Sequence, residues 1–182
     1  MAITEVGILQ IINNCTDLQS LNCSDSDDIN FENFQNITDG TSLVTNGTSL
    51  QFLSIKRCRI TDNGIIQLTR KFTNLLSLNC EGNGDCRIPV PGITNLGITE
   101  VTRVCRSLTH LDITNCHKIT DIMAITNNCP SLISLDITNC YKITNIMAIA
   151  NNCPSLKIIR GPHRINSGQH QHHLWLHETT NE

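Results

Sequence analysis

The segment that decides the fold is Cys129-Pro130-Ser131-Leu132-Ile133-Ser134-Leu135-Asp136-Ile137-Thr138-Asn139-Cys140. An earlier copy, at positions 105–116, reads Cys-Arg-Ser-Leu-Thr-His-Leu-Asp-Ile-Thr-Asn-Cys. A third copy begins at Cys153-Pro154-Ser155-Leu156, after the same interval. The three copies are 24 residues apart, and a segment that recurs at a fixed period of this length indicates a repeat protein.

Two landmarks define the repeat along the chain. Anchored on the first Leu of the pattern Leu-x-x-Leu-x-Ile/Cys, the units start at Leu18, Leu50, Leu75, Leu108, Leu132 and Leu156. A second block, Ile-Thr followed by an acidic residue or Asn, starts at Ile3, Ile37, Ile60, Ile93, Ile119 and Ile143. Because the two landmarks alternate in register, we interpret them as parts of one structural unit.

The leucine pattern predicts a short strand in each unit. Alternation places Leu135 and Ile137 on one face of the strand, and Ser134, Asp136 and Thr138 on the other. One face is therefore expected in the core and the other at the surface.

The Ile-Thr block predicts the start of a helix. Thr61 or Thr120 is a plausible N-cap, followed by Asp62 or Asp121, whose negative charge suits the first turn. Since one unit cannot bury its apolar face alone, the units must stack. We expect a curved α/β solenoid over residues 1–160, with a parallel sheet on its concave side and helices outside.

The cysteines follow the same register. Four precede the strand (Cys15, Cys105, Cys129, Cys153), three end the strand segment (Cys58, Cys116, Cys140), and two replace its last apolar residue (Cys23, Cys80). A reduced cysteine behaves as a small, well-buried hydrophobe, so we expect these nine in the core. Cys86 lies outside the pattern, and we expect it to react readily with labelling reagents.

Composition excludes several classes of function. With 13 Lys+Arg against 16 Asp+Glu, the chain has no basic face for nucleic acid or an anionic membrane. It has no apolar run long enough to cross a bilayer, and its first residues do not read as a secretory signal. We therefore expect a cytoplasmic location, with the nucleus as an alternative.

The pattern from Leu108 to Asp121, repeated from Leu50 to Asp62, resembles the cysteine-containing leucine-rich repeats of F-box/LRR proteins, which have a ribonuclease-inhibitor-like horseshoe fold. The resemblance covers roughly residues 3–160. It implies a protein-binding concave face, as in the substrate-recognition arm of an SCF-type ubiquitin ligase. A cullin-ligase adaptor would then be a further partner, if an F-box lies upstream.

The predicted first helix begins near Thr4, inside a repeat, and leaves no room for an F-box within this sequence. We expect the chain to be a fragment of a longer gene product. The alternative is a free-standing repeat adaptor or inhibitor with no link to ubiquitin.

No catalytic, metal or cofactor site is expected. The chain has no Cys-x-x-Cys pair, and Gly82-Asn83-Gly84 lacks the strand-to-helix context of a phosphate loop. Cys116-His117 becomes Cys140-Tyr141 in the next unit, which indicates variation between repeats rather than a catalytic pair. We therefore expect a binding protein and not an enzyme.

Two insertions, at approximately 24–36 and 81–92, lie at matching points between strand and helix. Such insertions map to loops on one edge of a solenoid. Phe31 and Phe34, in the acidic first insertion, are candidate anchors for a basic partner. The alternative is a surface loop whose two rings pack onto the solenoid.

The strand register places two rows of side chains on the concave face. One row is Ser20, Phe52, Ser77, His110, Ser134 and Ile158, and the next is Asn22, Ser54, Asn79, Asp112, Asp136 and Arg160. The second row sets Asp136 between Asp112 and Arg160. Our candidates for contacts with a partner are Phe52, His110, Asp112, Asp136 and Arg160.

The repeat pattern stops before residues 161–182, a His-rich tail. We interpret the tail as a loose end without a native metal, since termini are often poorly ordered. The alternative is that Leu174, Trp175 and Leu176 fold back and cover the last repeat.

Overall fold

The computed structural model describes residues 4–26, 28–31, 49–83, 92–144, 149, 152–161 and 174–176. Its helices are α1 (Glu5–Asn14), α2 (Asp62–Lys71), α3 (Asn95–Val104) and α4 (Met123–Asn128). Its strands are β1 (Ser20–Asn22), β2 (Phe52–Ser54), β3 (Ser77–Asn79), β4 (His110–Asp112), β5 (Ser134–Asp136), β6 (Ile158–Arg160) and β7 (Leu174–Leu176). The predicted block at Ile37 lies outside the described residues.

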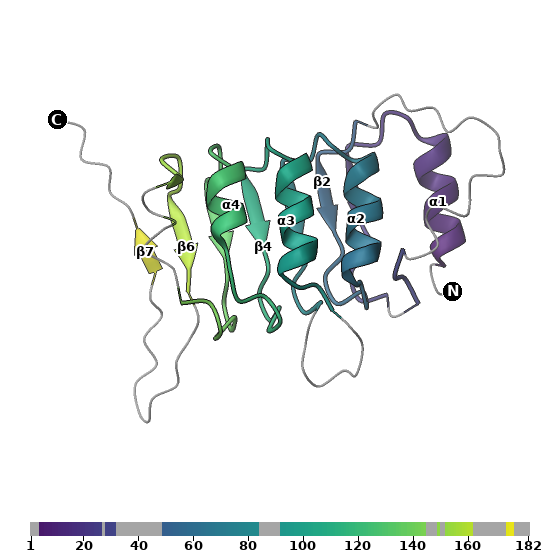
Figure 1. Ribbon diagram of the computed structural model, residues 1–182. Coiled ribbons are helices and arrows are strands. Elements are labelled where there is room, and N and C mark those ends of the chain that lie inside the picture. Colours follow the sequence, from purple (N-terminus) through teal and green to yellow (C-terminus); the bar gives the residue numbers. More distant parts are fainter. Residues whose placement is uncertain are drawn as a thin grey trace.

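The strands form one sheet in chain order, and the first six are parallel. Helices stand side by side along one face of this sheet (Figure 1). The register joins Ser20, Phe52, Ser77, His110, Ser134 and Ile158, as the sequence predicts. The predicted α/β solenoid with a parallel sheet is therefore confirmed.

The last strand, β7, departs from the parallel pattern. It pairs antiparallel with β6, and Trp175 lies opposite Ile159. The backbone of Leu174–Leu176 therefore continues the sheet beyond the last repeat, and whether this segment caps the repeat stays a prediction.

The core is a thin layer of leucine, isoleucine and cysteine between sheet and helices. The middle residues of the strands, such as Leu53, Leu78, Leu111 and Leu135, are almost fully buried. Eight of the nine repeat cysteines are buried with them, namely Cys23, Cys58, Cys80, Cys105, Cys116, Cys129, Cys140 and Cys153. The prediction of core cysteines is therefore confirmed for these eight.

Several buried thiols also satisfy backbone carbonyls of the preceding repeat. Cys116 Sγ donates to the Cys80 oxygen at 3.3 Å, and Cys140 Sγ donates to the Ile113 oxygen at 3.0 Å. Both oxygens also accept a backbone N–H, from Asn83 and from Cys116 respectively, so each thiol is an additional donor to its carbonyl. The thiols therefore serve both as small apolar groups and as weak donors.

Cys15 is a correction to the sequence prediction. It is the C-cap of α1, in the first repeat, and its side chain is exposed. The corresponding C-caps, Cys105 of α3 and Cys129 of α4, are buried because neighbouring repeats cover them. Register alone did not show that the first repeat lacks this cover. Cys86 lies outside the described residues.

A left-handed residue follows each of the first five strands. Each lies three positions after the strand, and the set is Asp25 (φ 61°), Arg57 (φ 53°), Gly82 (φ 77°), Asn115 (φ 60°) and Asn139 (φ 62°). Glycine, asparagine and aspartate tolerate this region better than other residues. The backbone N–H of each of the first four donates to the next repeat, for example Asn115 to the Thr138 oxygen at 2.9 Å.

The helix starts follow a shared pattern of capping. Thr4, Thr61 and Thr94 are N-caps whose hydroxyls accept from backbone N–H groups of α1, α2 and α3. Thr120 is not a cap, because α4 begins only at Met123 after Ile122, with no side-chain cap. The N-cap prediction is therefore confirmed for Thr61 and wrong for Thr120.

The residue after the threonine in the Ile-Thr block, Asp62 or Asn95, accepts hydrogen bonds from the following repeat instead of from its own helix. Asp62 accepts hydrogen bonds from Thr94 N (2.7 Å), Thr94 Oγ1 (2.6 Å) and Gly97 N (3.0 Å). Asn95, at the same point of α3, accepts from Thr120 N at 2.8 Å. A carboxylate at a helix N-terminus satisfies unpaired donors and complements the helix dipole.

A glycine lies three residues after the N-cap threonine in α1, α2 and α3. The space around this glycine differs from helix to helix. A Cβ on Gly97 would overlap Asp62 Oδ1 and lie 3.1 Å from Ile65 Cγ2, whereas a Cβ on Gly7 would meet only Thr4 Oγ1 at 3.5 Å. Gly97→Ala should therefore lower the free energy of unfolding by about 1–3 kcal/mol. Gly7→Ala should raise it, by up to about 1 kcal/mol, through helix propensity.

Urea denaturation followed by circular dichroism measures both changes, with Gly7→Ala as the matched control. Equal stabilisation by the two substitutions would show that Asp62 does not close the space at Gly97.

Thiol labelling tests the distribution of cysteines. Burial raises the pKa of Cys105 and Cys129 to about 12, so little thiolate forms in the native state. Near pH 8 an aromatic disulfide reagent should react rapidly with Cys15 and Cys86 alone. Cys15→Ala should remove one fast thiol per chain, while Cys105→Ala should leave the fast phase unchanged. Fast labelling of several buried repeat cysteines would contradict this arrangement.

Candidate functional site

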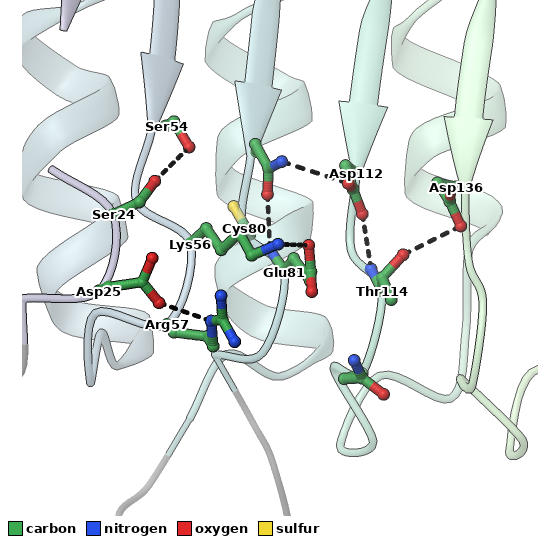
Figure 2. Close-up of polar contacts among 12 residues, drawn as sticks. Ser24, Asp25, Ser54, Lys56, Arg57, Cys80, Glu81, Asp112, Thr114 and Asp136 are labelled. Carbon is green, nitrogen blue, oxygen red and sulfur yellow. Dashed lines mark hydrogen bonds and ion pairs between the residues drawn. The ribbon is translucent and has the colours of Figure 1, made fainter. Parts of the chain in front are cut away.

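The candidate site is the sheet face opposite the helices, here named the concave face. Its first row holds Ser20, Phe52, Ser77, His110, Ser134 and Ile158, and its second row holds Asn22, Ser54, Asn79, Asp112, Asp136 and Arg160. A third row follows two residues later, with Ser24, Lys56, Glu81, Thr114 and Thr138. Figure 2 shows polar contacts within and between the second and third rows, with the helices behind the sheet.

The first row alternates serine with larger residues, two of which, Phe52 and His110, carry rings. Phe52 is 45% exposed, although an apolar ring is more stable when buried. Its register partner Ser77 is in turn paired with His110, whose side chain is exposed. His110 Nδ1 lies 2.9 Å from Thr109 Oγ1. The row therefore presents one ring on each side of Ser77.

Asp112 is a half-buried carboxylate in the second row. Its oxygens accept from Asn79 Nδ2 at 3.2 Å and from Thr114 N at 2.9 Å. Burial raises the pKa of Asp112, and the nearby charges of Asp136 and Glu81 add to that effect against the hydrogen bonds from Thr114. The folded environment thus disfavours the ionised form of this side chain.

Asp136 occupies the same position in the next repeat and has the opposite behaviour. It accepts from Thr138 N (3.0 Å) and Thr114 Oγ1 (2.9 Å), and it pairs with Arg160 Nη1 (3.2 Å). Burial by itself would raise the pKa of Asp136, but the hydrogen bonds from Thr138, Thr114 and Arg160 outweigh burial and lower it. The register prediction that Asp136 lies between Asp112 and Arg160 is confirmed.

The third row adds charges that our sequence analysis missed. Lys56 Nζ lies 2.6 Å from Glu81 Oε2, so this ion pair joins two neighbouring repeats. At the edge of the sheet, Arg57 Nε pairs with Asp25 Oδ1 at 2.7 Å (Figure 2). Continuing the period-2 alternation by one more step, two residues beyond Ser54 and Asn79, would have found Lys56 and Glu81.

The insertion residues do not join this face as expected. Phe31 is fully buried in the core, and so is Ile29. Removing the ring from water is worth about 2 kcal/mol, and a fully buried ring is not available to anchor a partner. Phe34 and most of the second insertion (84–91) lie outside the described residues.

The pair Cys116 and His117 is split between core and surface. The Cys116 thiol is buried, and burial raises its pKa well above the usual value, with the neighbouring thiols of Cys80 and Cys140 adding to the effect. The ring of His117 instead stacks on Tyr141, with 6.1 Å between centroids, and its Nδ1 lies 2.9 Å from the Asn139 oxygen. The two side chains are therefore not arranged as a nucleophile and its base.

Two further searches cover the described part of the chain. There, no group of three or more His, Cys, Asp or Glu side chains is placed to hold a metal ion. Among the same residues, no helix has the length and apolar character needed to cross a membrane.

Comparison with known proteins supports the fold. The C-terminal domain of tropomodulin from Caenorhabditis elegans matches with a TM-score of 0.55 at 17% sequence identity, over 81% of this chain and 89% of that chain. No protein-family model matches, and no curated protein matches either. The class defined by fold and comparison is a leucine-rich-repeat solenoid, and at this identity the likeness shows the fold alone.

The two aspartates allow a matched test of the electrostatics. Asn22 and Asn79 show that asparagine fits this position and still accepts from the N–H two residues later. At pH 7, Asp136→Asn should cost about 1 kcal/mol through loss of the Arg160 pair at Oδ2, while the Asn oxygen can still accept from Thr138 N and Thr114 Oγ1. Asp112→Asn should be neutral or slightly stabilising, because it removes a disfavoured charge.

The pH dependence of stability follows from the opposite directions in which folding shifts the pKa of Asp136 and the pKa of Asp112. Stability contributed by Asp136 is present above its unfolded pKa and is lost as pH falls through its lowered folded pKa. Stability contributed by Asp112 is present below its unfolded pKa and is lost as pH rises through its raised folded pKa. Urea titrations at pH 7 and about pH 3 should show that the difference in free energy of unfolding between Asp136→Asn and Asp112→Asn becomes smaller in acid. A difference that persists in acid would contradict the assignment.

Proposed function

We propose that the chain is a non-catalytic protein-binding module whose concave face is the binding surface. One observation supports this proposal most directly: Phe52 stays 45% exposed in the first row, beside a second row that carries the charges of Asp112, Asp136 and Arg160. Exposed aromatic rings surrounded by polar groups are typical of contact surfaces. The face spans six parallel strands, which suits an extended protein partner.

The more specific form of the proposal is the substrate-recognition arm of an SCF-type ubiquitin ligase. Its support is the resemblance of the repeats at Leu50–Asp62 and Leu108–Asp121 to those of F-box/LRR proteins. The alternative is an adaptor or inhibitor that binds a partner without any ubiquitin link. Either form suits the cytoplasm or nucleus, where buried thiols such as Cys105 and Cys140 stay reduced.

A pair of charge insertions tests the binding surface. Ser77→Arg places a long side chain in the middle of the concave face, and Leu96→Arg does the same at an exposed position (59%) of α3. In quantitative affinity capture from cells, Ser77→Arg should reduce partner recovery at least about tenfold, a loss typical of a hot-spot position. Leu96→Arg should leave recovery unchanged.

Circular dichroism of both variants checks that they fold. Retention of the same partners by Ser77→Arg would contradict the concave-face proposal. Recovery of a cullin adaptor with the wild-type chain would support the ligase form, and its absence would favour the adaptor or inhibitor.

A further inference from the structure

Phe52 and His110 flank Ser77 in the first row of the concave face, and the position above Ser77 is here called the slot. They lie two strands apart with Ser77 between them, so their backbones are separated by about 10 Å. Apolar atoms make contact at about 3.5–4.0 Å, so side chains on strands at this spacing suit one aliphatic stem placed between them. Ser77 is too small to fill it.

The charges beside this slot are unequally compensated. Lys56 pairs with Glu81, and Arg160 pairs with Asp136. Within the described part of the chain, no cationic side chain forms an ion pair with Asp112, which lies two residues along β4 from His110. One negative charge of the face is therefore left without a counter-charge, next to the slot.

We propose that this slot binds one Arg or Lys side chain of an extended segment of the partner protein. The aliphatic stem lies between Phe52 and His110, and the cationic head meets the Asp112 carboxylate. This inference rests on the proposed function of the concave face. Long cationic side chains combine an apolar stem with a charged end, and so they match both parts of the site.

The surroundings suit an extended segment in particular. Ser20, Ser77 and Ser134 lie in the first row, and a hydroxyl can both donate to and accept from a peptide backbone. A bound cation would also favour the ionised form of Asp112, which the folded environment otherwise disfavours.

Selection from a display library of random peptides tests the inference on the full chain. Peptides that bind wild type and are lost on Ser77→Arg report on the concave face. They should share an Arg or Lys, and Asp112→Asn should weaken them about tenfold or more. Asp112→Ser should do the same, since Ser54 shows that serine fits this position. The control Asp121→Asn, at an exposed aspartate before α4, should bind like wild type.

A charge exchange adds a second measurement. Replacing the selected cation by Glu should abolish binding to wild type and restore it to Asp112→Lys.

The outcomes separate this inference from the proposed function. Peptides that are lost on Ser77→Arg but share no cation, or that bind Asp112→Asn as well as wild type, would overturn the inference and leave the concave face as the binding surface. If no selected peptide distinguishes wild type from Ser77→Arg, both are wrong.

Discussion

The hydrogen-bond ladder that joins each repeat to the next is the constraint on which the structure depends. Strands of three residues are too short to hold a sheet alone, and the ladder continues past them, from Ile113 N to the Asp136 oxygen and from Asn115 N to the Thr138 oxygen. The second of these bonds requires a positive φ at Asn115, which explains why Asn, Asp or Gly occupies four of the five turn positions and makes Arg57 the exception.

The helix side obeys the same constraint by a different device. Asp62 accepts from Thr94 at the start of α3, and Asn95 accepts from Thr120 in the segment before α4, so each of these residues lies in one helix but stabilises the following repeat. The buried thiols complete the arrangement, because Cys116 and Cys140 donate to carbonyls of the preceding repeat. No repeat pairs all of its own backbone hydrogen-bonding groups, which is why such units are stable only when stacked.

Sequence periodicity predicted the fold and the strand register because both depend on which face of each unit is apolar. It failed where a residue's environment depends on the neighbouring repeat. Cys15 carries the repeat's cysteine but lacks cover, and Thr120 carries the capping motif before a helix that starts late. Phe31 lies in a polar insertion, where no period indicates whether its ring faces the core or the solvent. For the candidate site, the rows and the neighbours Asp136 and Arg160 were predictable, but the opposite pKa shifts of Asp112 and Asp136 were not.

Asp112 and Asp136 show why pairing is not readable from a single repeat. Their local sequences, Leu-Asp-Ile-Thr-Asn-Cys, are identical. Their electrostatic states differ because Asp136 has Arg160 on one side and the Thr114 hydroxyl on the other, whereas Asp112 has Asn79 and carboxylate neighbours. A slip of one residue in any strand would send these carboxylates toward the core and the leucines to the surface. The ladder that holds the register therefore also determines where the concave face keeps an uncompensated charge.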